Sequence, residues 1–251
     1  MPTDFSSPLI LGHRGAKNYA PENTLAAFTL ALEQGADGVE LDAKLSADGQ
    51  VIVFHDMTVN RTTNGKGLVS GLSFSQLREL DAGGFFSEQF RGEKIPSLDE
   101  VFESIGKRAV INVELTNYST PHDSLVERTC DLIRRHALQK RIIYSSFSPG
   151  ILKKAARFLP EVPRGLLARG GWIGAWARSF GFTFGDYAAL HPYITDVTHQ
   201  EVQRVHRLRR KINAWTSNRE EDTRRLISWG VDGIITDDPL TAVRVAREMA
   251  K

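Results

Sequence analysis

Residues 38–45 read Gly-Val-Glu-Leu-Asp-Ala-Lys-Leu, residues 47–50 read Ala-Asp-Gly-Gln, and residues 51–55 read Val-Ile-Val-Phe-His. The first and last of these segments have the composition of β-strands, and the short link between them contains Asp-Gly. A parallel crossover needs a dozen or more residues, whereas Asp-Gly is typical of a hairpin turn. We therefore expect the strand at 51–55 to fold back antiparallel on the strand at 38–45.

The rest of the chain alternates short β-like runs with amphipathic stretches, which is typical of an α/β fold with a mostly parallel sheet. Without the hairpin strand, the predicted strands are residues 9–13, 38–45, 109–115, 141–145, 165–168, 186–190, 211–215 and 233–236. The predicted helices are residues 24–34, 97–105, 123–136, 149–158, 199–210, 220–229 and 239–249. Eight parallel strands in 251 residues predict a closed (β/α)8 TIM barrel that forms a single domain over residues 1–251.

Residues 57–95 break this alternation. The segment contains six glycines and the aromatic residues Phe74, Phe85, Phe86 and Phe90. Compact domains seldom hold so long a connection without a purpose, so we expect an insertion at the C-terminal face of the barrel strands. A surface excursion with a small core of its own is the alternative.

The composition excludes several classes of protein. Lys and Arg total 32 against 30 Asp and Glu, so there is no basic excess to indicate a nucleic-acid partner. The single cysteine, Cys130, excludes an intramolecular disulfide and a cysteine metal site, and its helical context predicts core packing. No apolar run approaches the ~18 residues that span a bilayer, so we expect a soluble, cytoplasmic protein. The oligomeric state stays open.

Acidic side chains gather at the C-terminal ends of neighbouring strands, where such barrels place their active sites. Glu40 and Asp42 lie two apart on one strand and so share a face, and Glu114 comes from the next parallel strand. Two such charges repel by about 2.5 kcal/mol at an effective dielectric constant near 20. An all-carboxylate cluster suits Mg²⁺ or Ca²⁺. The alternative is a salt-bridge ladder that continues to Lys44.

Two histidines accompany this cluster. His13 ends the first strand, and the hairpin pairing predicts His55 opposite Leu41. Two imidazoles beside a metal site can take a proton from a nucleophile and give one to a leaving oxygen, and Arg14 offers bidentate contacts to phosphate. We expect structural roles for the other histidines, His122, His136, His191, His199 and His206.

In this order the motifs resemble those of the glycerophosphodiester phosphodiesterase family, whose barrel is shared with the phosphoinositide-specific phospholipases C. The resemblance covers essentially the whole chain. It rests on Gly12-His13-Arg14-Gly15, Pro21-Glu22-Asn23-Thr24, Gly38-Val39-Glu40-Leu41-Asp42, His55-Asp56, Ile95-Pro96-Ser97-Leu98, Asn112-Val113-Glu114-Leu115, Trp215-Thr216 and the run at 230–237.

The resemblance implies a phosphodiesterase of glycerol and lipid metabolism that hydrolyses glycerophosphodiesters to glycerol 3-phosphate and an alcohol. It implies that His13 and His55 are catalytic and that the carboxylates of Glu40, Asp42 and Glu114 bind a divalent cation. It further implies that Arg14 contacts phosphate, that Trp215 forms a wall beside the glycerol moiety, and that residues 57–95 help to shape the substrate pocket.

One position departs from the family pattern. Many members carry a lysine two residues after the third carboxylate, whereas this chain has Thr116. Threonine supplies one hydrogen bond and no charge, which affects substrate affinity more than the type of reaction. Asn117, Arg61 or Lys66 are candidates to compensate.

Three other functions are open to a sequence of this kind. Trp172, Trp176 and Phe180 share one helical face, which is typical of core packing but also of an interfacial patch, as in a lysophospholipase D acting on lysophospholipids at a membrane. A non-enzymatic barrel predicts the loss of at least one site residue, and none is lost. A sugar-phosphate isomerase predicts a glycine-rich phosphate cup after the last two strands, which this sequence lacks.

Overall fold

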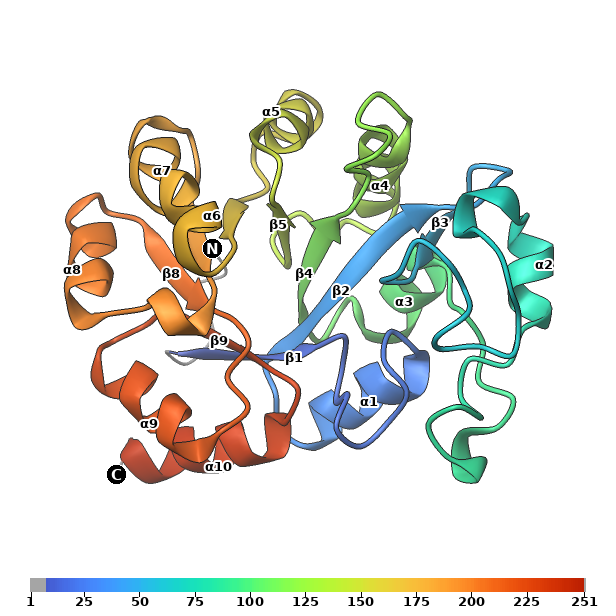
Figure 1. The fold of residues 1–251 in the computed structure, drawn as a ribbon, viewed down its shortest axis with the longest axis horizontal. Coiled ribbons are helices and arrows are strands. Elements are labelled where there is room, and N and C mark those ends of the chain that lie inside the picture. Colours follow the sequence, from blue (N-terminus) through green and yellow to red (C-terminus); the bar gives the residue numbers. More distant parts are fainter. Residues whose placement is uncertain (1–7, 251) are drawn as a thin grey trace.

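Eight parallel strands close into a ring in the computed structural model, which describes residues 8–250 (Figure 1). The ring contains β1 (Leu9–His13), β2 (Gly38–Leu45), β4 (Val110–Leu115), β5 (Ile142–Ser146), β6 (Arg164–Ala168), β7 (Ala189–Pro192), β8 (Lys211–Ala214) and β9 (Gly233–Thr236). Each strand pairs with the next in this order, and β9 returns to pair with β1. The predicted (β/α)8 barrel is confirmed.

The hairpin strand lies outside the ring. β3 (Val51–Val53) pairs antiparallel with β2, with Val53 opposite Ala43, as the Asp-Gly link predicts. Gly49 occupies the turn with a φ of +78°, a conformation that glycine adopts at no steric cost. The strand is two residues shorter than predicted. The Val53 N–H donates to Pro96 on the outer side of the strand, and the Phe54 N–H makes a last bond to Asp42 on β2. His55 therefore follows the ladder instead of pairing within it.

The seven predicted helices cover the outside of the ring. They are α1 (Leu25–Glu33), α3 (Leu98–Ile105), α4 (Leu125–Arg135), α5 (Pro149–Phe158), α8 (His199–Arg207), α9 (Glu220–Ser228) and α10 (Pro239–Met249). Local signals explain several starts. The Thr24 hydroxyl accepts from the Ala27 N–H at 3.2 Å to cap α1, and Ser97 and Glu100 form a capping box at α3.

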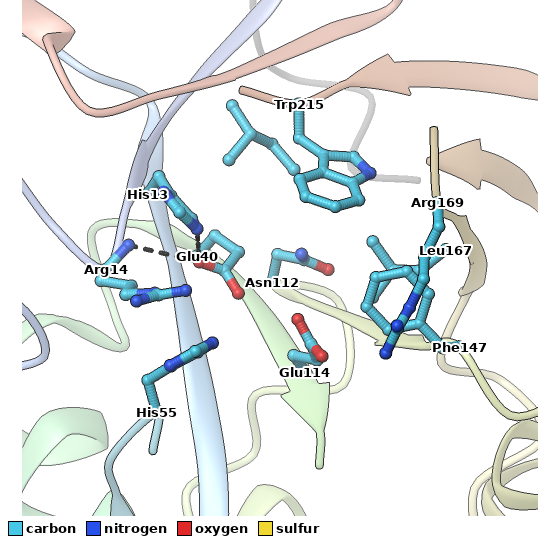
Figure 2. Close-up of a pocket in the computed structure, with 11 residues that line it drawn as sticks. His13, Arg14, Glu40, His55, Asn112, Glu114, Phe147, Leu167, Arg169 and Trp215 are labelled. Atoms are coloured by element: carbon cyan, nitrogen blue, oxygen red, sulfur yellow. Dashed lines mark hydrogen bonds and ion pairs between the residues drawn. The ribbon is translucent and has the colours of Figure 1, made fainter. Parts of the chain in front are cut away.

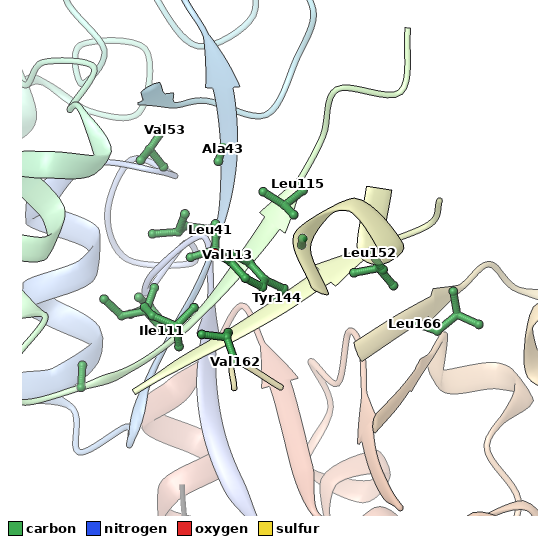
Figure 3. Packing of buried hydrophobic residues seen from close by; sticks show 14 of the residues in the cluster. Leu41, Ala43, Val53, Ile111, Val113, Leu115, Tyr144, Leu152, Val162 and Leu166 are labelled. Atoms are coloured by element: carbon green, nitrogen blue, oxygen red, sulfur yellow. The ribbon is translucent and has the colours of Figure 1, made fainter. Parts of the chain in front are cut away.

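Strand side chains alternate between two environments. Leu41, Ile111 and Val113 face outward and pack beneath the helices in the main core (Figure 3). The opposite faces point into the barrel, where Leu11, Val110, Ile143 and Ile235 form a small cluster. Because this alternation has a period of two, Glu40 and Asp42 necessarily face the barrel interior.

Residues 57–95 lie at the C-terminal face of the barrel and also have a small core of their own, so both arrangements considered from the sequence are present. The segment contains α2 (Phe74–Glu79) and the short 3-10 helices Val69–Gly71 and Glu88–Phe90. It has its own core around Val59 and Leu77, which also packs on β3. Its first part, including Met57 and Leu68, lines a groove together with Asp42 and Glu114 at the C-terminal ends of the strands.

Two parts of the chain differ from the sequence predictions. β7 begins three residues later than predicted, because the Asp186 carboxylate pairs with Arg164 at the surface and Tyr187 stacks on Phe182. A helical segment outside the seven predicted helices follows β6, where Trp172, Trp176 and Phe180 were expected to share a helical face. It is formed by α6 (Gly171–Trp176), a π-helical turn (Ala177–Gly181) and α7 (Phe182–Phe184). Its aromatic face is exposed, so the core reading of that face is wrong. Among residues 8–250, no helix combines the length and apolarity needed to cross a bilayer.

The residues expected to have structural roles lie mostly as predicted. Cys130 is buried, with its Sγ 3.1 Å from the Tyr144 hydroxyl. His191 is buried inside the barrel, where its Nε2 lies 2.9 Å from the Asn213 amide nitrogen, and burial lowers its pKa to about 3. Other histidines contact side chains outside the cavity described below: His136 contacts Asp99, His206 contacts Asp232, and His199 contacts Gln203.

Candidate active site

A cavity of about 280 Å³ opens at the C-terminal ends of the barrel strands (Figure 2). It brings together residues on or directly after seven barrel strands, together with His55 after the hairpin, which lie far apart in the sequence. Six of the seven predicted site residues line it, and the seventh, Asp42, lines an adjoining groove. The lining residues are His13, Arg14, Glu40, His55, Asn112, Glu114, Phe147, Leu167, Arg169, Trp215 and Ile235.

Three carboxylates converge at the base of this cavity. Each of Glu40, Asp42 and Glu114 offers an oxygen, and these oxygens all lie within 4.8 Å of one another. The register explains the convergence, since Asp42 on β2 lies beside Glu114 on β4. Burial and repulsion from the other two carboxylates raise the pKa of Glu40 well above its usual value. Burial and repulsion from Asp42 likewise raise the pKa of Glu114 to about 7.

The positive charge beside the cluster neutralises it only in part. Arg14 neutralises part of it, with its Nε 3.3 Å from Asp42 Oδ2, but its Nη1 donates to Glu22 at 2.9 Å. The ladder alternative is wrong at Lys44, because its ammonium donates to the Thr116 hydroxyl at 2.9 Å. An oxygen-only cluster that resists ionisation fits a hard divalent cation.

A tight turn places His13 and Arg14 beside these carboxylates. Arg14 has a φ of +55°, and its backbone N–H donates to the Glu40 carbonyl at 2.9 Å. Gly15 follows with a φ of +88°, and a Cβ there would lie 2.6 Å from the Ala27 carbonyl carbon. The Gly-His-Arg-Gly motif therefore needs glycine at its last position, so that the turn can pack against α1.

His13 is oriented by a carboxylate from the far end of the chain. Its Nδ1 lies 2.6 Å from Oδ1 of Asp237, and its Nε2 lies 3.9 Å from Oε2 of Glu40. An ionised carboxylate only accepts hydrogen bonds, so Nδ1 carries the proton and Nε2 is left to face the cavity. Burial lowers the pKa of His13, although the hydrogen bond to Asp237 opposes this shift.

His55 has the same arrangement with a neighbour in the sequence. Its Nδ1 lies 2.6 Å from Oδ1 of Asp56, so its Nε2 is also the nitrogen that is free to react. Arg61 donates to both oxygens of Asp56 and to both oxygens of Glu22. The hydrogen bonds from Arg61, with a further contribution from His55, hold the pKa of Asp56 at about 2. The insertion thus positions the second histidine through Arg61.

An aromatic wall faces the acidic cluster across the cavity. The Trp215 indole N–H donates to the His191 carbonyl at 2.8 Å, and its ring meets the rings of Phe147 and Tyr193 edge to face. The Arg169 guanidinium lies 5.2 Å from the centre of the Phe147 ring. Phe147 and Arg169 were not predicted, and their only signal in the sequence is that each directly follows a barrel strand.

Asn112 and Asp237 are two more residues of the site that the sequence analysis did not identify. Asn112 is fully buried beside Glu40 on the neighbouring strand, and both polar atoms of its amide lack a partner among residues 8–250. Buried amides are nearly always hydrogen-bonded, so Asn112 is placed to meet a ligand in the cavity. The sequence does indicate this position of Asn112: it lies two residues before Glu114 on β4, and side chains two apart on a strand point to the same face.

The adjoining groove, of about 530 Å³, contains the family departure at Thr116. None of the three candidate residues lines this groove with a charged group. Arg61 is held by Glu22 and Asp56, Asn117 donates to Asp123, and Lys66 is exposed. Lys44 instead brings an ammonium to the same place through its bond to Thr116. Burial lowers the pKa of Lys44, while Asp42 and Glu114 oppose the shift.

Comparison with known proteins matches this site to a family. The sequence model of the glycerophosphoryl diester phosphodiesterase family matches residues 13–241, a range that begins at His13 and includes all seven predicted site residues. The chain belongs to this glycerophosphodiester phosphodiesterase family. The resemblance found in the sequence motifs is thereby confirmed.

Several members of this family are similar to the chain over nearly their full length. A glycerophosphodiester phosphodiesterase of Caldanaerobacter subterraneus subsp. tengcongensis is 39% identical, over 96% of this chain and 98% of the relative. A phosphodiesterase of Oleispira antarctica, solved with the product sn-glycerol-3-phosphate, is 31% identical with a TM-score of 0.88, covering 96% of this chain and 97% of that one. A structure from Silicibacter pomeroyi gives 26% identity and a TM-score of 0.87, covering 98% and 95%.

Proposed function

We propose that this protein hydrolyses glycerophosphodiesters to glycerol 3-phosphate and an alcohol, in a reaction that needs a divalent cation. The observation that carries the proposal is that carboxylate oxygens of Glu40, Asp42 and Glu114 lie within 4.8 Å of one another, beside a cavity lined by two histidines that each leave Nε2 free. The Oleispira antarctica phosphodiesterase, which has the same fold, was solved with sn-glycerol-3-phosphate, the product that we propose here.

The three carboxylates are the residues that would hold the cation, with Mg²⁺ or Ca²⁺ as the candidates. When bound, such an ion supplies Lewis-acid polarisation of a phosphoryl oxygen. The protein contributes the shape and charge of the site. Asn23 donates to Asp42 Oδ2 at 2.9 Å and the Tyr118 hydroxyl donates to Glu114 Oε1 at 2.6 Å, so the orientation of both carboxylates is fixed before any ligand arrives.

His13 and His55 would carry the protons. Nε2 of one neutral imidazole accepts the proton of the attacking hydroxyl. The other ring acts as the imidazolium, with both nitrogens protonated, and gives its Nε2 proton to the oxygen of the departing alcohol. Asp237 and Asp56 hold the two rings with Nδ1 protonated, which keeps the reactive nitrogen toward the cavity. Positioned acid–base groups of this kind typically contribute 10²–10⁴-fold in rate, on the order of 3–5 kcal/mol of barrier.

The remaining residues of the cavity divide between the two ends of the substrate. Arg14 and the unpartnered amide of Asn112 are placed for phosphoryl oxygens, and Trp215 forms the wall for the glycerol moiety. The alcohol group would extend into the adjoining groove, which is lined by residues of the insertion and by Lys44.

A panel of substrates tests this function. Purified protein is incubated with glycerophosphocholine, glycerophosphoethanolamine, glycerophosphoglycerol and lysophosphatidylcholine, and the products are identified by mass spectrometry. We expect glycerol 3-phosphate from the water-soluble diesters, abolished by excess EDTA and restored by Mg²⁺ or Ca²⁺. Full activity in EDTA would refute the metal assignment, and much faster cleavage of lysophosphatidylcholine would favour the lysophospholipase D alternative.

A further inference from the structure

The helical segment 171–184 exposes an aromatic surface at the rim of the barrel. Its exposed side chains include Trp172 at 95%, Ile173 at 81% and Phe184 at 82%. Trp176 and Phe180 are also exposed, and the Phe180 and Phe184 rings stack with centres 6.2 Å apart. The segment begins two residues after Arg169, which lines the cavity, and α6 and α7 lie at the upper left of Figure 1. We call these five side chains the aromatic rim.

The aromatic rim belongs to a segment that is firmly attached to the barrel. Phe182 is fully buried and stacks on Tyr187. The Arg178 guanidinium donates to the carbonyl groups of Arg169 and Gly171 and pairs with Asp196 at 3.0 Å. These bonds fix which face of the segment points outward, so the exposed rings form a defined surface.

The chemistry of the aromatic rim indicates the partner. Exposed apolar patches of this kind mark interaction sites, and Trp and Phe are the residues that helices place at the boundary between water and lipid. Residues 169–185 contain two arginines and no acidic residue. Arg178 is neutralised by Asp196, so the positive charge beside the apolar face is that of Arg169, which is exposed and has no ion pair among residues 8–250. Anionic lipid head groups complement this combination, because they attract cationic segments at a membrane surface.

We propose that the aromatic rim docks on the surface of an anionic lipid bilayer. Because Arg169 joins the segment to the cavity wall, docking brings the mouth of the cavity close to the lipid head groups. Docking requires no particular reaction in the cavity, so a failure of this proposal would leave the proposed hydrolysis intact, and the reverse also holds.

Vesicle sedimentation tests the docking. The full chain is mixed with vesicles of phosphatidylcholine containing phosphatidylglycerol, or of phosphatidylcholine alone, and the bound fraction is measured. We expect binding to the anionic vesicles that weakens at least tenfold in the double variant Trp172→Ser/Trp176→Ser. A matched control, Leu240→Ser/Met249→Ser, removes two exposed apolar side chains from α10 and should bind like the wild type. Circular dichroism checks that each variant is folded.

A second variant keeps the fluorescent reporters. Phe180→Ser/Phe184→Ser retains all four tryptophans, so quenching by brominated phosphatidylglycerol can be compared directly with the wild type. We expect strong quenching in the wild type and a large loss in this variant. The proposal is overturned if the wild type does not sediment with anionic vesicles or if both double variants bind as well as it does. It is also overturned if the rim instead joins two copies of the chain, seen as a concentration-dependent dimer that either variant dissociates.

Discussion

Nδ1 of His13, at the end of the first barrel strand, lies 2.6 Å from Oδ1 of Asp237, which directly follows the last. Lys17 approaches the same oxygen at 3.1 Å, and Asn218 donates to Oδ2 at 2.7 Å. Although burial alone would raise it, the pKa of Asp237 is lowered to about 2 by His13 and Lys17. Asp237 therefore stays an ionised acceptor at neutral pH, and it holds His13 in the tautomer that leaves Nε2 free.

Replacing Asp237 with Asn should slow hydrolysis by about 10²–10⁴-fold with little change in KM. The amide can donate to Nδ1, which stabilises the wrong tautomer, with the proton on Nε2, and takes away the carboxylate that stabilises the protonated ring. The matched variant Asn218→Ala keeps the carboxylate and should cost far less. Steady-state kinetics with glycerophosphocholine measures both. Near-normal kcat in Asp237→Asn would show that this carboxylate does not set the tautomer that catalysis needs.

The activities of the His13→Ala and His55→Ala variants should differ when the leaving group of the substrate changes. His13→Ala and His55→Ala should each lower kcat/KM by about 10²–10⁴-fold on glycerophosphocholine, because each removes one proton transfer. With a p-nitrophenyl phosphodiester, whose leaving oxygen needs no proton, one of the two variants should recover most of its rate. That variant has lost the general acid. Equal recovery of both variants, or of neither, would contradict separate roles.

Cation binding should stabilise the protein more at pH 8 than at pH 5. In the metal-free protein the pKa of Glu114 is raised to about 7 and that of Glu40 is also raised. The folded state thus binds protons more tightly than the unfolded state, so stability falls as pH rises from the usual carboxyl pKa through about 7. A cation removes this cost where the carboxylates are ionised, and at pH 5 it must first displace protons.

Thermal melts at both pH values, with EDTA or with Mg²⁺ or Ca²⁺, measure this difference. Glu114→Gln should reduce both the rise in Tm on adding the cation and its dependence on pH. A shift in Tm of equal size at pH 5 and pH 8, or no shift in the wild type, would count against the carboxylate site.

Lys44 should substitute for the charge that Thr116 does not provide. Lys44→Met preserves much of the side-chain volume but removes the ammonium from the groove, so we expect KM to rise on the order of tenfold with a smaller change in kcat. Adding Thr116→Lys to this variant should lower KM again. Lys66→Met, on the exposed part of the insertion, is the matched control. If Lys44→Met leaves KM unchanged, its ammonium does not act on the substrate.

Much of this fold could be predicted because its signals are local. The strand at 38–45 and the helix at 239–249 were placed with the bounds that the structure has, and the Asp-Gly link identified the strand outside the ring. The helical segment at 171–184 could not be predicted in the same way. Its large apolar side chains are exposed, whereas apolar residues at helical spacing normally predict a face buried in the core.

The site residues also fall into those that a local sequence pattern predicts and those that it does not. Alternate side chains of a strand share a face, and this alternation can be followed in the sequence of both neighbouring strands. Glu40, Asp42 and Glu114 could therefore be predicted to lie together. Asp237 could not be grouped with His13, because their contact depends on the closure of the ring. Phe147 and Arg169 lie on loops after strands, where no repeating pattern fixes the direction of a side chain.

The closure of the ring between β1 and β9 also has a consequence for synthesis of the protein. His13 and Asp237 lie 224 residues apart in the sequence, so translation reaches the carboxylate only after every strand of the ring has been made. The hairpin and all three carboxylates of the acidic cluster are present once Glu114 has been added, but the histidine lacks its carboxylate partner until residue 237 is made. Every prematurely terminated product that ends before β9 therefore lacks the pair formed by His13 and Asp237.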